Sequence, residues 1–298
     1  MIEPFDIEGK VIAITGASSG FGHHFAGTLA AKGATTILGA RRIDKLEKRV
    51  GEITEQGGKA EALPLDVNDS ESINKFLDQA YKKHGRVDVL INNAGIAYST
   101  PFDEMTPELW DRMLSVHVDA SYACTKAAWA HMVAAGYGRL MFTSSPFGLY
   151  AASTFAHYSA AKAAMLGLSK ALALEGKEHN IHANAVAPFS ASRMTGRTNE
   201  EQETSSFGPR YLAQLAIYLC HESTAETGGV FEVGGGHVHR VRNELSNPLK
   251  LMDDQHTAEN IAANKDVLNE FTESQHPGVG DSWTIGREVH GDDWQGQF

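Results

Sequence analysis

The sequence predicts an α/β fold in which a doubly wound parallel sheet is covered by helices on both faces, giving three layers. Short apolar runs alternate with helical patterns up to about residue 235. Most of these runs are apolar throughout, as in strands that are buried on both faces. Strict alternation of strand and helix favours parallel strands joined by crossover helices.

Apolar runs mark the expected strands, which cover residues 11–15, 35–40, 61–67, 87–93, 139–144, 181–187 and 228–233. Helical patterns fill the intervals at residues 21–32, 44–55, 70–83, 107–135, 156–179 and 209–220. Some boundaries carry local signals, because Gly33 can end the first helix and Asp69 or Ser70 can cap the third. We expect residues 1–242 to form one domain.

Residues 189–208 interrupt the alternation with a polar segment rich in Gly, Ser and Thr. A loop of this length in a compact domain is usually a lid or a disordered segment. It follows the carboxyl end of the sixth strand, and open α/β sheets bind their ligands at the carboxyl ends of strands. We therefore expect a substrate lid here, with a plain surface loop as the alternative.

Residues 243–298 differ from the rest in charge. They hold eleven acidic residues against three basic ones, which is −8 of the chain's net charge of −11. Residues 255–271 have apolar side chains at roughly helical spacing and predict one amphipathic helix. We expect this acidic extension to dock on the body or on a neighbouring subunit, with a flexible tail as the alternative.

Composition excludes several classes of protein. A net charge of −11 argues against nucleic acid as a partner. No apolar run approaches the roughly 20 residues that a membrane helix needs, so no membrane partner is expected. The first residues carry acids rather than a basic leader, and only two cysteines occur in 298 residues. A reducing compartment follows, and we expect a cytoplasmic protein.

The segment T-G-A-S-S-G-F-G at 15–22 connects the first strand to the first helix. Its glycines permit a tight turn and close approach of the backbone to a pyrophosphate, while the helix N-terminus supplies free N–H groups. In the first strand-to-helix turn of an alternating chain this is strong evidence for a dinucleotide site. The expected contacts are Gly16, Ser18, Ser19, Gly20, Phe21 and Gly22.

The end of the second strand predicts the choice of nicotinamide cofactor. An acid there would bind the free ribose of NAD, but the strand continues into Arg41 and Arg42. Arginine suits a 2′-phosphate because its planar donors pair with phosphate oxygens. We expect NADP(H) to be preferred, with NAD(H) possible and with solvated arginines as the plain alternative.

Tyr158 and Lys162 are the candidates for the chemistry. Four residues apart on a helix, their side chains lie on one face, where an ammonium can favour the phenolate and lower the phenol's pKa toward neutrality. Such a phenol suits general acid/base work. Ser145 can hold a substrate oxygen if it lies at the end of an adjacent strand. A chance Tyr-x-x-x-Lys pair on a solvated helix is the plain alternative.

With these residues in view, the chain resembles the classical short-chain dehydrogenase/reductase family. The matching motifs are T-G-x-x-x-G-x-G at 15–22, D-V at 66–67, N-N-A-G at 92–95, the Ser145, Tyr158 and Lys162 set, and Pro188 after the sixth strand. The resemblance implies a Rossmann-like fold and hydride transfer between a nicotinamide and an alcohol or carbonyl.

The resemblance also implies roles for individual residues. Tyr158 would be the acid/base, Lys162 would bind the nicotinamide ribose, and Ser145 would orient the substrate oxygen. Further cofactor contacts would come from Asp66, Val67, Asn93, Ala94, Gly95, Pro188 and Thr195. We expect substrate contacts from Ser145, Phe147, Tyr150, Phe189 and Met194, and no metal ligands.

His117 departs from the family pattern. An asparagine commonly stands there and carries a proton relay to the lysine. Histidine can both donate and accept, so a relay through water is one reading, and a buried histidine bonded to backbone is the other. The V-H pair and several later segments, such as N-I-H-A-N-A-V-A-P at 180–188, resemble the (3R)-hydroxyacyl-CoA dehydrogenase unit of peroxisomal multifunctional enzyme type 2.

The function that these features indicate is hydride transfer between NADP(H) and a secondary alcohol or ketone on a bulky or acyl substrate. The alternatives are an NAD-dependent (3R)-3-hydroxyacyl-CoA dehydrogenase, a reductase of steroids or other bulky ketones, and a nucleotide-sensing binding protein without activity. The resemblance implies a homodimer or homotetramer.

Overall fold

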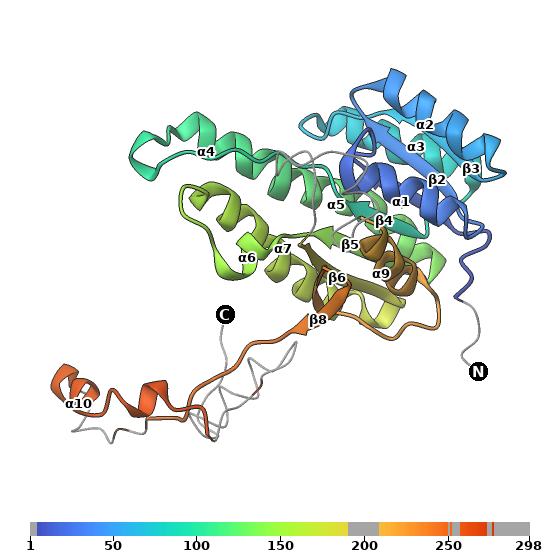
Figure 1. Cartoon of the computed structure of the whole chain (residues 1–298). Helices are drawn as coiled ribbons and strands as arrows, with labels where there is room; N and C mark the ends of the chain where they lie inside the picture. Colours follow the sequence, from blue (N-terminus) through green and yellow to red (C-terminus); the bar gives the residue numbers. More distant parts are fainter. Residues whose placement is uncertain (1–4, 190–208, 250, 252–256, 273–275, 277–298) are drawn as a thin grey trace. The chain divides into compact units, whose positions relative to one another are not determined.

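The computed structural model describes residues 5–189, 209–249, 251, 257–272 and 276 (Figure 1). Thr195, Met194 and the expected lid, apart from Phe189, lie outside the described residues. Contacts group the chain into two compact units, Met1–Arg240 and Val241–Phe298. The first unit carries all the candidate site residues that the structure describes.

The first unit is built on an eight-stranded sheet with the order β3-β2-β1-β4-β5-β6-β7-β8. The strands are β1 (Val11–Thr15), β2 (Thr35–Ala40), β3 (Lys59–Pro64), β4 (Val89–Asn92), β5 (Gly138–Thr143), β6 (Ile181–Pro188), β7 (Val230–Gly234) and β8 (His237–Val241). Neighbouring strands from β3 to β7 are parallel. The predicted Rossmann-like α/β fold is confirmed.

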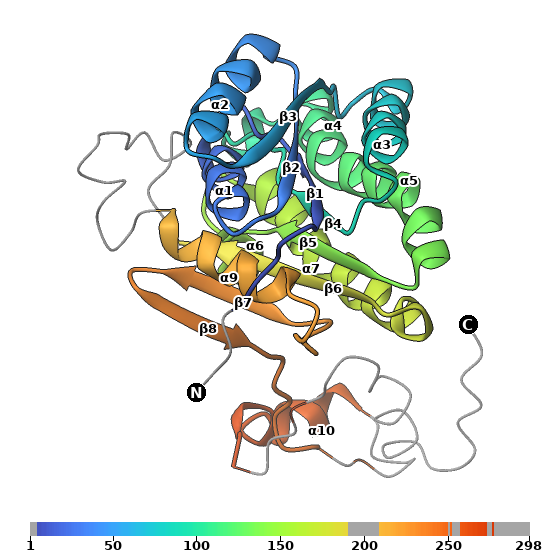
Figure 2. The same ribbon diagram turned by 90° about the vertical axis from the view of Figure 1, so that its right-hand side faces the viewer.

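Helices cover both faces of this sheet (Figure 2). They are α1 (Gly20–Ala30), α2 (Ile43–Glu55), α3 (Ser70–His84), α4 (Pro107–Leu114), α5 (Ala120–Ala135), α6 (Pro146–Tyr150), α7 (Ala156–Glu175) and α9 (Arg210–Cys220). One apolar core joins α1, α2 and α9 to the sheet, and a second joins α3, α5 and α7 to the opposite face. The central strands, such as β1, β4 and β5, are therefore buried from two sides, which explains their largely apolar sequences.

The order of the strands reverses beside β1, which pairs with β2 on one side and with β4 on the other. Open α/β sheets bind ligands at such a switch point, outside the carboxyl ends of the strands. The glycine-rich turn after β1 and the segment after β4 meet there. The Thr15 hydroxyl accepts hydrogen bonds from the backbone N–H groups of Asn93 and Ala94, both at 3.0 Å.

Among the described elements, one short α-helix and one strand were not predicted. The first is α6, and the second is β8, which follows β7 through Gly235 and Gly236 with φ values of 59° and 81°. Two consecutive positive φ angles are typical of a type I′ hairpin turn, so these glycines return the chain along β7. The His-Val-His-Arg-Val sequence of β8 is largely exposed and lacks the apolar pattern of the other strands.

The helix predicted over residues 107–135 is continuous, but it contains a π-helical turn. Ser115–Asp119 forms this turn between α4 and α5. By contrast, the helix predicted over 156–179 ends at Glu175, and Lys177–His179 forms a 3₁₀ turn. The third strand ends at Pro64, so that Asp66 and Val67 lie just beyond its carboxyl end rather than within it.

The second unit contains α10 (Ala258–Ala263) and a 3₁₀ turn at Val267–Asn269. The single helix predicted over 255–271 is therefore wrong within the described residues. Asn264 ends α10, and its side chain donates to the carbonyl of Asn260 at 2.8 Å. Asparagine competes for backbone groups in this way and favours helix ends. Among the described helices of the chain, none combines the length and apolarity needed to cross a membrane.

Candidate active site

The glycine-rich turn packs tightly against the segment that follows β4. A Cβ atom on Gly16, whose φ is 70°, would lie 2.7 Å from the Cα of Ala94. One on Gly22 would lie 2.6 Å from the Asn93 amide nitrogen and 2.8 Å from the carbonyl oxygen of Gly16. A Cβ on Gly20 would meet nothing within 4 Å. Two glycines thus permit close packing, and the third leaves the N-terminus of α1 open to a ligand.

Arg42 lies over this turn. Its guanidinium donates to the Ser18 hydroxyl at 2.8 Å and to the Ser19 hydroxyl at 3.1 Å. The chain after the second strand therefore places a cation beside the two serines that precede α1. Arg41 has an exposed side chain beside it.

The remaining residues expected to contact the cofactor lie at the same edge of the sheet. Asp66 and Val67 follow β3, and Asn93, Ala94 and Gly95 follow β4. The Asn93 side chain donates to the carbonyl of Thr15 at 2.9 Å, so it supports the turn. Pro188 is the last residue of β6, and Phe189 beyond it donates its N–H to the carbonyl of Val233 at 2.7 Å.

Ser145 and Tyr158 meet at the carboxyl end of β5. Ser145 caps α6, where its hydroxyl accepts from the Phe147 N–H at 3.2 Å. Its side chain lies beside the Tyr158 phenol and acts to lower the pKa of that group, and Tyr158 is only 7% exposed. Lys162, one turn further along α7, places its ammonium 5.6 Å from the centre of the Tyr158 ring. The structure therefore brings the three expected catalytic residues together.

The electrostatics of this group differ from the expectation. Burial raises the pKa of Tyr158 above its ordinary value of 10.0, and the nearby Ser145 side chain offsets only part of the rise. Burial lowers the pKa of Lys162 to about 7. The predicted lowering of the Tyr158 pKa by Lys162 is wrong for this geometry. A half-neutral amine attracts a phenolate weakly, and this amine donates instead to the carbonyl of Thr143 at 2.6 Å.

His117 belongs to the π-helical turn and is buried. Its Nε2 lies 2.7 Å from the carbonyl oxygen of Ile96 and 3.2 Å from the Ile96 nitrogen. One nitrogen cannot both donate and accept, so the shorter contact assigns Nε2 as the donor. Burial, then the charge of Lys162, hold the pKa of His117 well below its usual value. A neutral imidazole bonded to backbone therefore stands 5.5 Å from the Tyr158 ring.

Aromatic side chains surround the phenol. Phe147 and Phe155 pack against each other at 5.1 Å and against Tyr158 at 6.1 and 6.2 Å between ring centres. Of the expected substrate residues, Phe147 is thus brought to the site. The side chains of Tyr150 and Phe189 are largely exposed, at 64% and 57%. Sequence reasoning missed Phe155, whose only signal was its apolar character three residues before Tyr158.

The residues at this edge fit a dinucleotide. Lys162 is fully enclosed, yet the structure gives its three-donor ammonium a single hydrogen-bond acceptor among the described residues, the carbonyl of Thr143. The remaining donors suit ribose hydroxyls. Together with the open N-terminus of α1 and the cation of Arg42, they provide for a ribose, a pyrophosphate and a phosphate along one edge.

A doubly wound sheet with this turn at its switch point, and with a serine, tyrosine and lysine at its carboxyl edge, defines a nicotinamide-dependent alcohol dehydrogenase or ketoreductase. The family model described as short chain dehydrogenase matches residues 10–204. The chain belongs to the short-chain dehydrogenase family, and it is an NAD(P)-dependent enzyme of that class.

Two curated relatives and one solved structure illustrate the similarity. Peroxisomal multifunctional enzyme type 2 of Mus musculus is 36% identical over 93% of this chain, which spans only 39% of that relative's length. The 3-oxoacyl-acyl-carrier-protein reductase of Thermotoga maritima is 34% identical over 78% of this chain and 99% of its own. A short chain dehydrogenase from Mycobacterium avium has a TM-score of 0.81 and 28% identity, covering 89% of this chain and 96% of its own.

Proposed function

We propose that this chain transfers hydride between NADP(H) and a secondary alcohol or ketone on a bulky or acyl substrate, with Tyr158 as the acid/base. The observation that carries the proposal is that Ser145, the buried Tyr158 and the Lys162 amine lie together at the carboxyl end of β5. When bound, the dinucleotide supplies or accepts the hydride at the substrate carbon. The chain's own residues orient the oxygen and move its proton.

In the direction of reduction, the carbonyl oxygen accepts hydrogen bonds from the Ser145 hydroxyl and the Tyr158 phenol. A phenol with a raised pKa is fully protonated at neutral pH, so it is ready to donate as the oxygen gains negative charge. The half-buried aromatic side chains around the phenol reduce the access of water and strengthen both hydrogen bonds. Ser145 also holds the oxygen in place when the reaction runs in reverse.

The acyl part of the proposal is supported by the relatives. The Thermotoga maritima relative is named as a reductase of 3-oxoacyl groups on acyl-carrier protein. The sequence also resembles a (3R)-hydroxyacyl-CoA dehydrogenase unit. NAD-dependent oxidation of a (3R)-3-hydroxyacyl-CoA is therefore the second candidate function, and a steroid or bulky-ketone reductase is a third that rests on the sequence resemblance alone.

The exposed face of α7 supports a dimer or tetramer. Its exposed positions are Ala160, Ala163, Gly167, Ala171, Leu174 and Glu175, so small or apolar side chains predominate and one is charged. Small residues allow close approach of a second helix, and an exposed apolar face on a soluble enzyme favours burial in an interface. The two buried free cysteines, Cys124 and Cys220, are compatible with the cytoplasm, although the mouse relative has a peroxisomal name.

A single experiment tests the proposed function. Wild type and Tyr158→Phe are assayed with NADPH and NADH on 3-oxoacyl thioesters, steroids and simple ketones. We expect turnover with NADPH on the acyl or bulky substrates, and a loss of at least about a thousandfold in Tyr158→Phe because proton transfer is removed. Dinucleotide affinity, measured by fluorescence titration, should change less than threefold. Undiminished turnover in Tyr158→Phe would refute the assigned role.

A further inference from the structure

The backbone is strained between the two residues that meet at the substrate oxygen. Among the described residues, three that are not glycine have positive φ, and two of them lie in this segment: Ala151 at 59° and Thr154 at 64°. Ala151 also has ψ of 173°, a conformation that essentially only glycine adopts. Such conformations persist only where the surroundings enforce them, and they concentrate at functional sites.

Hydrogen bonds hold both ends of the strained segment. At its start, the Tyr150 hydroxyl donates to the Glu232 carboxylate of β7 at 3.1 Å. At its end, the Thr154 carbonyl accepts from the Thr100 N–H at 2.8 Å, and the Thr154 hydroxyl lies 2.6 Å from that of Ser99. The segment is thus fixed to β7 on one side and to the chain following β4 on the other.

Burial of apolar surface cannot explain the position of the Tyr150 ring. Its side chain is 64% exposed, so it gains little from apolar burial. The bond to Glu232 is therefore the interaction that specifies where this ring, and the end of α6, lie.

The position of α6 decides the geometry of the site. This helix is capped by Ser145 and rests directly on α7 (Figure 1). A Cβ atom on Gly148 would lie 2.7 Å from the carbonyl carbon of Lys162, so the two backbones are in contact there. Any rotation of α6 on α7 would move the Ser145 hydroxyl and the Phe147 ring relative to Tyr158.

We propose that Tyr150, Glu232, Ala151 and Thr154 form a clamp that holds α6 in the orientation where Ser145 meets Tyr158. These are positioning residues for the reduction of a carbonyl substrate, and in this respect the inference rests on the proposed function. The strain at Ala151 is maintained because the clamp fixes both ends of a short connection. The clamp acts on the step in which Ser145 and Tyr158 stabilise the developing charge.

Three substitutions test the hydrogen bond between Tyr150 and Glu232. Tyr150→Phe keeps the ring and removes the donor, Glu232→Ala removes the acceptor, and Glu232→Gln keeps an acceptor without the charge. We expect kcat for the best ketone substrate to fall about tenfold in the first two and less than threefold in Glu232→Gln, with KM changed less than twofold in all. A direct contact of Tyr150 with substrate would instead raise KM.

Ala151→Gly tests the strain. Glycine adopts the φ and ψ of this position freely, so thermal stability should rise or stay equal. If the strained connection positions the site, kcat should nonetheless fall severalfold, because the released backbone lets α6 move. Asn180→Gly is the matched control. Asn180 has φ of 54° but precedes β6 at the opposite edge of the sheet, so its replacement should leave kcat unchanged.

Hydrogen exchange of the peptide covering residues 146–156 gives a readout that does not need turnover. We expect exchange about tenfold faster in Tyr150→Phe and Glu232→Ala, and near the wild-type rate in Glu232→Gln. Wild-type exchange and wild-type kcat in Tyr150→Phe and Ala151→Gly would overturn the clamp. If the wild type reduced no substrate while exchange responded as expected, the clamp would stand and the proposed function would fail.

Discussion

Burial moves the two ionisable groups at the centre of the site toward their neutral forms. Tyr158 has its pKa raised and Lys162 has its pKa lowered to about 7, because each loses water without gaining a charged partner. The sequence indicated their proximity from a spacing of four on a helix, and that proximity is observed. It could not indicate the direction of the shifts, since burial depends on residues such as Phe147 and Met113 that pack around the pair.

The lowered pKa of Lys162 makes stability depend on pH. Between about pH 7 and pH 10.5 the unfolded chain binds a proton that the folded chain does not, so the free energy of unfolding rises with pH in this window. The slope is at most about 1.4 kcal/mol per unit. We expect the free energy of unfolding of the wild type, relative to that of Lys162→Met, to rise by about 2 kcal/mol between pH 7 and pH 9. Urea unfolding at constant ionic strength measures it.

Tyr158→Phe is the control for this prediction. The pKa of Tyr158 is raised above 10.0, so its titration falls outside the range from pH 7 to pH 9. This variant should keep the wild-type dependence on pH. Parallel curves for wild type and Lys162→Met would show that Lys162 has an ordinary pKa in the folded protein.

At the scale of single elements, prediction succeeded where the signal is local. The first two strands have the predicted bounds, because the apolar run of the first ends at Gly16 and that of the second ends at Arg41. The glycine-rich turn was also found, because a turn that needs positive φ restricts the sequence directly.

Elements that depend on distant contacts were missed. The π-helical turn is fixed by the bond from His117 to Ile96, and no local pattern in Ser-Val-His-Val-Asp encodes it. Its formation also requires the absence of a side chain at Gly95, where a Cβ atom would collide with the His117 ring. Likewise Glu232, on the seventh strand, gave no sign in the sequence that it would bond to Tyr150.

The turn after β1 and the start of α2 together predict the choice of dinucleotide. Arg42 is held over the turn by Ser18 and Ser19 and can meet a 2′-phosphate with charged hydrogen bonds. Such bonds contribute roughly 1.5–3 kcal/mol, or about tenfold to a hundredfold in affinity. We expect Arg42→Ala to weaken the binding of NADPH by this factor and the binding of NADH by less than threefold. Fluorescence titrations at one salt concentration measure both affinities.

A matched charge control separates recognition from general electrostatics. Lys45 lies one turn along α2 with an exposed side chain, so Lys45→Ala removes a nearby positive charge without touching the turn. This variant should bind both dinucleotides slightly more weakly, and by the same factor. An equal loss of NADPH and NADH affinity in Arg42→Ala would mean that this arginine does not read the phosphate.

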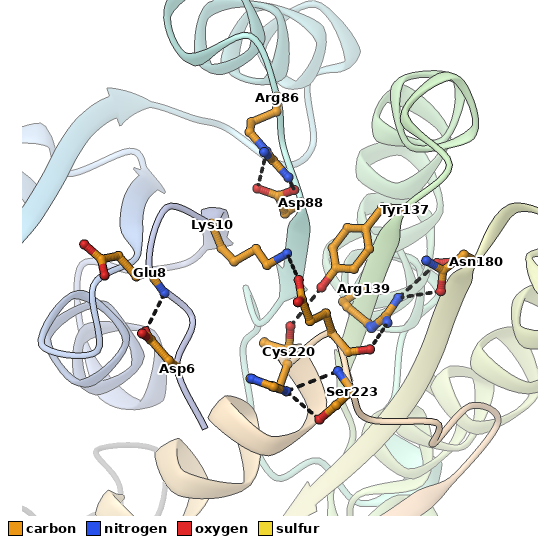
Figure 3. A network of polar contacts seen from close by, with 12 residues as sticks. Asp6, Glu8, Lys10, Arg86, Asp88, Tyr137, Arg139, Asn180, Cys220 and Ser223 are labelled. Carbon is orange, nitrogen blue, oxygen red and sulfur yellow. Dashed lines mark hydrogen bonds and ion pairs between the residues drawn. The ribbon is translucent and has the colours of Figure 1, made fainter. Parts of the chain in front are cut away.

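Across the whole first unit, the carboxyl and amino edges of the sheet carry different groups of polar residues. The candidate site occupies the carboxyl edge. At the opposite edge, a polar network joins the starts of β1, β4 and β5 to the end of α9 (Figure 3). Asp88 accepts from the Val11 N–H at 2.7 Å and pairs with Arg86. Stability and activity should therefore respond to substitutions at different edges.

Arg139 is the centre of this network. It is 2% exposed, and its guanidinium donates to the carbonyls of Gly138 and Asn180, both at 2.9 Å, and of Glu222 at 3.2 Å. It also lies 4.4 Å from the centre of the Tyr137 ring. Burial lowers its pKa, although not enough to neutralise a guanidinium. The charge is held by backbone carbonyls rather than by a buried carboxylate.

Arg139→Met should lower stability without changing catalysis. Methionine fills the space but leaves buried carbonyls without donors, at a cost of about 3 kcal/mol, or a fall in Tm of roughly 5–10 °C. Lys10→Met is the control, since Lys10 also contacts the Tyr137 ring but pairs with the largely exposed Glu222 and should contribute less than about 1 kcal/mol. Both variants should keep wild-type kcat and KM at 25 °C. A loss of kcat in Arg139→Met under conditions where it is fully folded would show that strain at the amino edge reaches Ser145 and Tyr158 through β5, and the two edges could no longer be treated as separate.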